Sequence, residues 1–179
     1  MNRRFTIPFD PRRFRDCLGL FPTGVCVVTA AGGDGPVGMT MNSFNSLSLE
    51  PPLVLFSVDR RARSLPAWEA APAYAVHVLA EDQQALSERF AISHDAKWDG
   101  VAWKPGLHGV PLLDDVVARF ECVPHARHDG GDHLLFVAEV KSMAAEPGKL
   151  PLVYRGGRYG GLRPSGGIAH IWPLDGDAD

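Results

Sequence analysis

Residues 38–58 read GMTMNSFNSLSLEPPLVLFSV, and the rest of the chain is organised around this stretch. Within residues 40–48, six of the nine positions carry a hydroxyl or an amide, with apolar residues between them. Small polar groups cost stability when they are buried without partners, so a strand that only covers a core has little use for them. The same groups on a rigid element suit a flat ligand rich in hydrogen-bonding atoms. The pattern favours a ligand-binding strand, with a Ser/Thr-rich strand end and loop as the alternative.

The segments on either side predict a sheet. A β-branched run at residues 25–29 and a turn at residues 32–35 come before residues 38–48, which we expect to form one strand. The apolar run at residues 53–58 follows a Pro-Pro corner and predicts a second buried strand. Further strands are expected at residues 74–79, 116–123, 134–143 and 152–154. At least six strands and few helices predict a mainly β protein, a closed antiparallel barrel with peripheral helices.

Three short helices are expected around this barrel. Asp10 and Pro11 are typical of a helix start, and Phe14, Leu18 and Phe21 then form an apolar stripe that should pack against the core. The other two helices are expected at residues 65–70, capped by Ser64, and at residues 82–90.

Length and composition indicate one domain over residues 1–179, with a core at about residues 14–162 and a loosely held C-terminal tail. The chain is 45% hydrophobic and 22% charged, and its net charge of −3 argues against a general nucleic-acid or membrane-surface binder. Apolar runs stay well below the ~18 residues of a membrane-spanning helix. Three widely spaced cysteines argue against a disulfide framework and fit a reducing cytoplasm.

A group of arginines follows the second buried strand. Arg60, Arg61 and Arg63 come directly before Ser64, which stands at an expected helix start. Helix amides, a hydroxyl and guanidinium groups together suit a phosphate. A solvated basic turn is the alternative, but proximity to the hydroxyl-rich stretch favours a phosphate site. The sequence leaves open which arginine contacts the phosphate.

His133 follows a Gly-Gly-Asp turn, which places its side chain at the rim of the barrel. The histidines at positions 94, 108, 125 and 128 are interpreted as ordinary surface or core residues, and His77 as a core residue. Because no pair of histidines has ligand spacing with a carboxylate, no metal site is predicted. The chain also lacks Gly-x-Ser-x-Gly and Gly-x-Gly-x-x-Gly motifs, which disfavours a serine hydrolase and a dinucleotide-binding fold.

Several short motifs accompany the opening stretch in a specific order. They are PTGV at residues 22–25, QAL at 84–86, FA at 90–91, KW at 97–98, GVPLL at 109–113, GDH at 131–133 and PLVY at 151–154. Their order and spacing over residues 14–162 resemble the short-chain flavin reductases. This split-barrel family supplies reduced flavin to two-component monooxygenases.

The resemblance implies a split β-barrel that uses FMN or FAD, with NADH or NADPH as the hydride donor. It implies that residues 40–43 face the flavin ring, largely through backbone amides, and that Ser46, Ser48 and the turn at residues 59–64 lie towards the ribityl chain and phosphate. His133 matches the residue placed where the nicotinamide stacks, which implies a catalytic role. It further implies a homodimer that passes reduced flavin to a monooxygenase. The positions implied to contact the flavin are Thr40, Met41, Asn42, Ser43, Ser46, Ser48, Ser57, Asp59, Arg63, Ser64, Phe90, Ala91 and Tyr159.

The chain departs from the family pattern at the turn, where Asp59 and Ala62 replace the common Asn and Ser. A carboxylate beside a phosphate is unfavourable, so the arginines or Ser64 must compensate. Two alternatives share the split barrel. A pyridoxamine-phosphate-oxidase-like enzyme would keep FMN and oxidise an amine, but it needs a second phosphate pocket, for which the C-terminal half offers only scattered arginines. The other alternative is a non-enzymatic flavin- or haem-binding protein.

Overall fold

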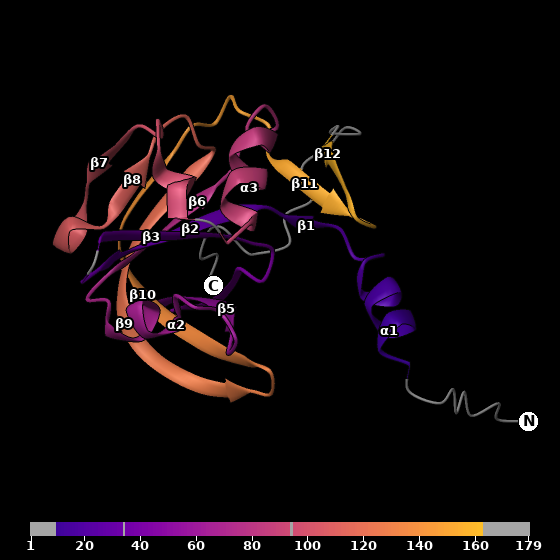
Figure 1. Cartoon of the computed structure of the whole chain (residues 1–179). Helices are drawn as coiled ribbons and strands as arrows, with labels where there is room; N and C mark the ends of the chain where they lie inside the picture. The colour runs from indigo at the N-terminus through magenta and orange to yellow at the C-terminus, as the bar shows by residue number, and fades with distance from the viewer. Residues whose placement is uncertain (1–9, 34, 94, 163–179) are drawn as a thin grey trace, which may run out of the picture.

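The structure, a computed structural model, describes residues 10–33, 35–93 and 95–162. Figure 1 shows a curled sheet with short helices at its margins, and the prediction of a mainly β chain is confirmed. The strands are β1 (Thr23–Gly24), β2 (Cys26–Gly32), β3 (Gly35–Met41), β4 (Asn45–Leu49), β5 (Pro52–Asp59), β6 (Tyr74–Val78), β7 (Trp103–Pro105), β8 (Pro111–Leu113), β9 (Ala118–Gly130), β10 (His133–Ala145), β11 (Leu152–Arg155) and β12 (Arg158–Gly161). The helices are α1 (Pro11–Leu18), α2 (Leu65–Ala70) and α3 (Gln84–Ala91), with 3-10 turns η1 (Asp95–Trp98) and η2 (Leu107–Gly109). The predicted C-terminal tail lies largely outside the described residues.

Seven strands form one antiparallel sheet in the order β3-β2-β6-β9-β10-β5-β4. β3 and β4 are its opposite edges, yet only residues 42–44, which we call the seam, separate them in the chain. The four peptide steps from Met41 to Asn45 span at most about 14 Å, so the sheet has to curl until its edges face each other. This curl is the expected split barrel. The prediction of one continuous strand over residues 38–48 is wrong, because the chain must cross from one edge to the other.

The long β9–β10 hairpin joins the two halves of the sheet. β6 pairs with β9 at its start, from Ala118 to Cys122, whereas β5 pairs with β10 from His133 to Glu139. A two-residue turn closes the hairpin, and Gly131 in it has a φ of +77°, which a side chain would strain. The predicted Gly-Gly-Asp turn is confirmed. β9 begins two residues later than predicted but continues to Gly130, and β10 extends beyond its predicted range at both ends.

An aromatic cluster fills the inside of the curled sheet. Phe56 of β5 is fully buried, and its ring centroid lies 5.2–6.1 Å from those of Trp68, Tyr74 and Phe136. Trp68 comes from α2, so this helix contributes to the core, and the Tyr74 hydroxyl donates to the Trp68 carbonyl at 3.0 Å. The alternating burial along β5 confirms the predicted buried strand.

His77 of β6 is fully buried, which confirms its interpretation as a core residue. Its Nδ1 donates to the Val27 carbonyl at 3.0 Å, and its Nε2 accepts from the Leu113 amide at 3.1 Å. The second contact assigns the proton to Nδ1, so the neutral ring connects β6 with β2 and β8. Burial lowers the pKa of His77 to about 4.

The helix predictions are partly wrong in their packing. α1 starts as predicted, since Asp10 accepts a hydrogen bond from the Arg12 amide at 2.9 Å. However, α1 has no buried residue, and Phe14 and Leu18 are more than half exposed, because the helix stands away from the sheet (Figure 1). Ser64 precedes α2 with helical backbone angles and makes no capping bond; its Oγ instead accepts from the Trp68 indole at 3.2 Å.

A second sheet of order β1-β11-β12 lies beside α3. Backbone hydrogen bonds from the Val25 amide to the Leu152 carbonyl (3.2 Å) and from the Leu152 amide to the Leu79 carbonyl (2.8 Å) attach this sheet to the barrel. Within the described residues, no helix is long and apolar enough to cross a membrane.

Candidate functional site

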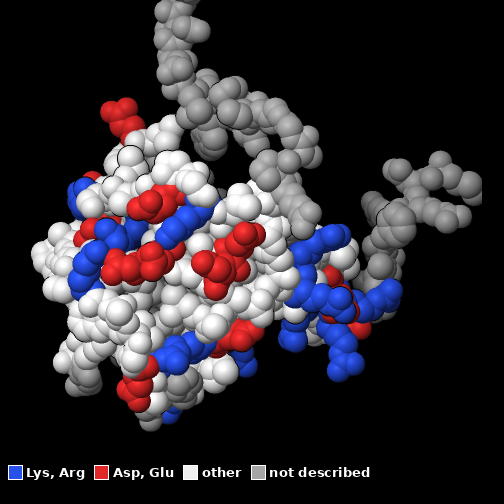
Figure 2. Space-filling view, turned by 90° about the horizontal axis from the view of Figure 1, so that it is seen from above, with Lys and Arg blue, Asp and Glu red and all other residues white. Residues whose placement is uncertain are grey.

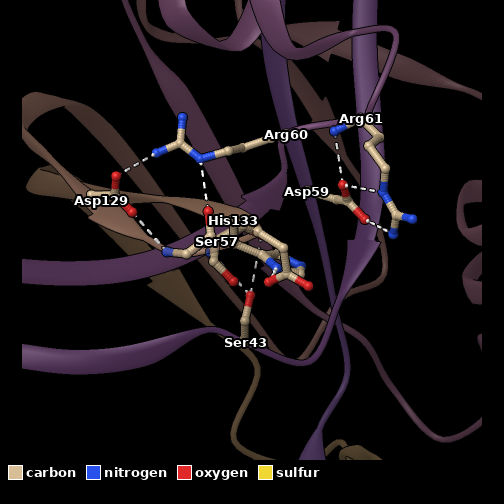
Figure 3. Close-up of polar contacts among 9 residues, drawn as sticks. Ser43, Ser57, Asp59, Arg60, Arg61, Asp129 and His133 are labelled. Atoms are coloured by element: carbon tan, nitrogen blue, oxygen red, sulfur yellow. Dashed lines mark hydrogen bonds and ion pairs between the residues drawn. The ribbon is translucent and has the colours of Figure 1, made fainter. Parts of the chain in front are cut away.

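The seam is held against β5 by one serine. β4 pairs with β5 only up to Leu55, so within the described part of the chain no strand pairs with this edge of β5 beyond that residue. There the Ser57 amide donates to Ser43 Oγ at 3.0 Å, and the side chain takes the place of a strand. Figure 3 shows this contact. Two of the predicted flavin-binding residues, Ser43 and Ser57, are therefore in contact with each other.

A cavity of about 190 Å³ lies where the seam begins; we call it the seam cavity. It brings together five of the predicted flavin-binding residues from three distant segments. Tyr154 and Val25 also line it and were missed, because nothing in their local sequence distinguishes them from core residues. The five are Thr40, Met41, Asn42, Ala91 and Tyr159.

The side chains around the seam cavity are tied together by Ser87 of α3. The Thr40 hydroxyl donates to the Ser87 carbonyl at 2.6 Å, and the Ser87 and Tyr159 hydroxyls lie 2.9 Å apart. The hydroxyl of Thr40 is thus occupied by the protein. What β3 offers to a ligand is its backbone, since an edge strand has one row of N–H and C=O groups without a strand partner.

Phe90 does not line the seam cavity. It is 1% exposed and packs edge-on against Trp98, with the ring centroids 4.8 Å apart. A Cβ at Gly38 would lie 2.7 Å from the Phe90 ring. The Phe90 ring therefore packs directly against β3 at Gly38, and the absence of a side chain at Gly38 allows this close approach.

A second cavity, of about 360 Å³, lies beside the turn after β5; we call it the Arg63 cavity. Arg63 and Ser64, two residues of the predicted phosphate site, line it. Ser93, Lys97 and Trp98 line it too and were missed, because they lie about 30 residues further along the chain. Arg63 Nη2 donates to Ser93 Oγ at 3.2 Å, and Lys97 Nζ donates to the Gly38 carbonyl at 3.0 Å.

The other two arginines of the turn are bound to carboxylates (Figure 3). Arg61 binds Asp59 through both Nε (3.1 Å) and Nη2 (2.7 Å), and these bonds hold the pKa of Asp59 well below its usual range. Arg60 reaches to Asp129 of the β9–β10 hairpin at 3.3 Å. The unfavourable carboxylate at position 59 is thus neutralised within the turn, and Arg63 is the arginine that faces the cavity.

His133 stands at the start of β10, opposite Asp59, with its side chain 41% exposed. Its Nδ1 lies 2.8 Å from Asp132 Oδ1. His133 is at a strand end, as expected, but it does not line the seam cavity or the Arg63 cavity.

Ser46 and Ser48 lie apart from the turn. They are in β4 and pair with Val54 and Leu53 near the start of β5. Asp59 ends β5, five residues beyond Val54, which is about 17 Å of strand. The structure therefore does not bring these serines together with Arg63.

A third cavity, of about 590 Å³, adjoins the seam cavity and shares Asn42 and Tyr154 with it. We call it the outer cavity. It extends to α1 and is also lined by Thr23, whose buried hydroxyl has no hydrogen-bond partner in the part of the chain that the structure describes. Among the described residues, no group of three or more His, Cys, Asp or Glu side chains could hold a metal ion.

The curled sheet, whose two edges meet at the seam, defines a split-barrel protein with a cavity where the edges meet. Residues 18–163 match the family described as "Flavin reductase like domain", and the chain belongs to this family.

Individual relatives are similar over most of their length. The chain is 47% identical to an FMN reductase (NADH) of Agrobacterium fabrum, over 84% of this chain and 86% of that protein. It is 39% identical to the reductase subunit of a flavin-dependent monooxygenase of Mycobacterium tuberculosis, over 93% and 90%. Its fold matches the Streptomyces globisporus NADH:FAD oxidoreductase, solved with NAD and FAD fragments, with a TM-score of 0.84, 39% identity and coverage of 90% and 98%.

Proposed function

We propose that this chain is an NAD(P)H:flavin oxidoreductase that reduces FMN or FAD and passes the reduced flavin to a partner monooxygenase. The observation that best supports this function is the pair of adjoining cavities that share Asn42 and Tyr154. They offer a smaller site at the seam and a larger space beside it, and hydride transfer requires two reactants in contact. The relatives, which are NADH-dependent flavin reductases and reductase subunits of monooxygenases, support the same function.

In this proposal the chain binds and orients, while flavin supplies the capacity to accept a hydride. β3 is an edge strand, and its residues Thr40 and Met41 line the seam cavity together with Asn42 of the seam, so backbone groups that β2 does not pair are available to a ligand there. Fixed N–H dipoles stabilise the negative charge that hydride transfer leaves on a flavin ring, without any titrating acid. Ser43 and Ser57 hold the seam in place, and Tyr154 and Tyr159 close the cavity from the second sheet.

Steady-state NADH oxidation, measured with and without added flavin, tests this function. We expect turnover to rise with added FMN or FAD. Turnover of an amine on tightly held FMN would instead support the oxidase alternative, and flavin binding without any NAD(P)H oxidation would support a binding protein.

We propose that Arg63 and Ser64 hold the flavin phosphate. Arg63→Ala is expected to weaken flavin affinity roughly tenfold or more, since a lost charge-assisted contact costs about 1.5–3 kcal/mol. Arg63 is exposed, so the melting temperature should change little. Titration of flavin fluorescence measures the affinity. Arg60→Ala is the matched control, because Arg60 binds Asp129; an equal loss in the control would contradict the assignment.

We propose that His133 positions the nicotinamide. His133→Ala is expected to raise the KM for NADH or slow hydride transfer several-fold, because one hydrogen bond from a partly exposed ring contributes about 0.5–1.5 kcal/mol. Flavin Kd and melting temperature should stay nearly unchanged. Stopped-flow reduction of bound flavin is the measurement, with His125→Ala, an exposed histidine of β9, as control. An unchanged reductive half-reaction, or a loss of stability, would assign His133 no such role.

We further propose that residues 1–179 form a single domain that works as a homodimer. α1 and the residues after it expose Leu18, Leu20 and Phe21 by 58–73%, an apolar surface that a second copy would cover. Figure 2 shows Lys and Arg gathered at the side where α1 lies, while acidic and basic side chains are interspersed over the rest of that face. Light scattering after gel filtration tests the dimer.

We also propose a cytoplasmic location, because the three cysteines are unpaired, as is usual in a reducing compartment.

A further inference from the structure

The Arg63 cavity is lined by several side chains that can donate hydrogen bonds and, among the described residues, by no acidic one. Arg63 and Lys97 are its cations, and Ser64 and Ser93 add hydroxyls. Trp98 also lines it, and its indole Nε1 is buried with no hydrogen-bond partner among the described residues. A set of donors with two positive charges suits a ligand end that only accepts hydrogen bonds, such as a phosphate.

Lys97 is the less expected of the two cations. It is half-buried, and one of the three N–H groups of its Nζ donates to the Gly38 carbonyl. The other two N–H groups remain available to a ligand. Burial, and then the positive charge of Arg63, lower the pKa of Lys97. Both effects disfavour the ammonium ion, and a bound anion would offset both.

The Arg63 cavity lies next to the seam cavity along two walls. On β3, Gly38 lines the Arg63 cavity and Thr40 lines the seam cavity. At the end of α3, Ala91 lines the seam cavity, and Ser93, two residues further on, lines the Arg63 cavity. Two residues along a strand span about 7 Å. A ribityl chain separates the ring of a flavin from its phosphate by a similar length, so a flavin ring at the seam would place its phosphate end near Lys97.

We propose that Lys97 is a specificity-determining residue, which makes the Arg63 cavity select the phosphorylated flavins FMN and FAD over riboflavin. This inference rests on the proposed flavin reductase function and adds to it a rule for which flavins are accepted. Arg63 contributes charge from the exposed rim, whereas Lys97 acts from the half-buried wall, where its charge is less screened by solvent.

The test is titration of riboflavin, FMN and FAD against the parent protein, Lys97→Met and Lys97→Arg. Methionine keeps the apolar stem and removes the charge. In Lys97→Met, the Kd values for FMN and FAD are expected to rise roughly tenfold or more, while that for riboflavin stays constant; Lys97→Arg should retain most of the preference. Lys104→Met is the matched control, because Lys104 is exposed and pairs with Asp114 at 2.8 Å.

A second measurement uses the parent protein alone, in case Lys97→Met folds poorly. Inorganic pyrophosphate should raise the apparent Kd for FMN and leave that for riboflavin unchanged. Equal weakening of all three flavins in Lys97→Met, no weakening of any, or a parent protein that binds riboflavin as tightly as FMN would each overturn the role of Lys97 and leave flavin reduction intact. A parent protein that binds no flavin at all would instead overturn the proposed function.

Discussion

Phe56→Ala is expected to lower the free energy of unfolding by about 3–5 kcal/mol, the largest loss of stability that we expect from a single substitution here. Phe56 is 0% exposed and contacts three buried aromatic rings from α2, β6 and β10. Removing its ring leaves a cavity that these rigid neighbours cannot fill by small shifts, because they are themselves enclosed by the curled sheet. Urea denaturation at neutral pH measures the change.

Phe56→Leu is the control for this prediction. Leucine refills most of the volume, so its cost should be clearly smaller than that of alanine. Because Ser57, the next residue, holds the seam through Ser43, we also expect Phe56→Ala to weaken flavin binding at temperatures where the protein remains folded. Equal stabilities of the alanine and leucine variants would show that the centre of the barrel is not packed as described.

Acidification is expected to destabilise the protein through His77. Its pKa is lowered to about 4 in the folded state, mainly by burial, whereas an unfolded histidine titrates near 6.5. Between these values the unfolded chain binds a proton that the folded chain does not. The contribution of His77 to stability is therefore complete above pH 6.5 and decreases as the pH falls towards 4. From pH 7 to pH 4.5 the loss should be about 2–3 kcal/mol.

His77→Gln isolates this effect. Glutamine does not titrate, although an amide group can replace part of the hydrogen bonding to Val27 and Leu113. Its stability at pH 7 is expected to be lower than that of the parent, but it should depend less on pH, by the same 2–3 kcal/mol. The measurement is urea unfolding of both proteins at pH 7 and pH 4.5. Parallel pH profiles would mean that other groups cause the acid sensitivity.

Much of the fold was predictable because the signals are local. The alternating run of β5, the Gly-Gly-Asp turn of the β9–β10 hairpin and the start of α1 at Asp10 each depend on interactions within a few residues. The family resemblance was likewise available from the order of short motifs. The break of residues 38–48 into β3 and β4 was not predictable, because both parts have the composition of a strand.

The candidate site was only partly predictable, for a related reason. Thr40, Met41 and Asn42 stood out by composition, and they do line the seam cavity. Composition could not tell that the Thr40 hydroxyl is occupied by Ser87, a residue 47 positions away. The three arginines of the turn look equivalent in the sequence, and only the positions of Asp59 and Asp129 decide that Arg63 is the one facing a cavity.

The sequence by itself determined the class of secondary structure, the turn of the β9–β10 hairpin, the start of α1 and the family. Short-range sterics, hydrogen bonding and apolar periodicity suffice for these features. Only the tertiary structure decided which distant residues are in contact. Ser87 contacts Tyr159 across 72 positions, and Lys97 contacts the Gly38 carbonyl across 59. The tertiary structure also decided that α1 buries no residue in the core. The physical reason is the curl of the sheet, which brings β3, the end of α3 and the second sheet to one place. This curl depends on contacts between distant segments, so no local sequence pattern predicts it.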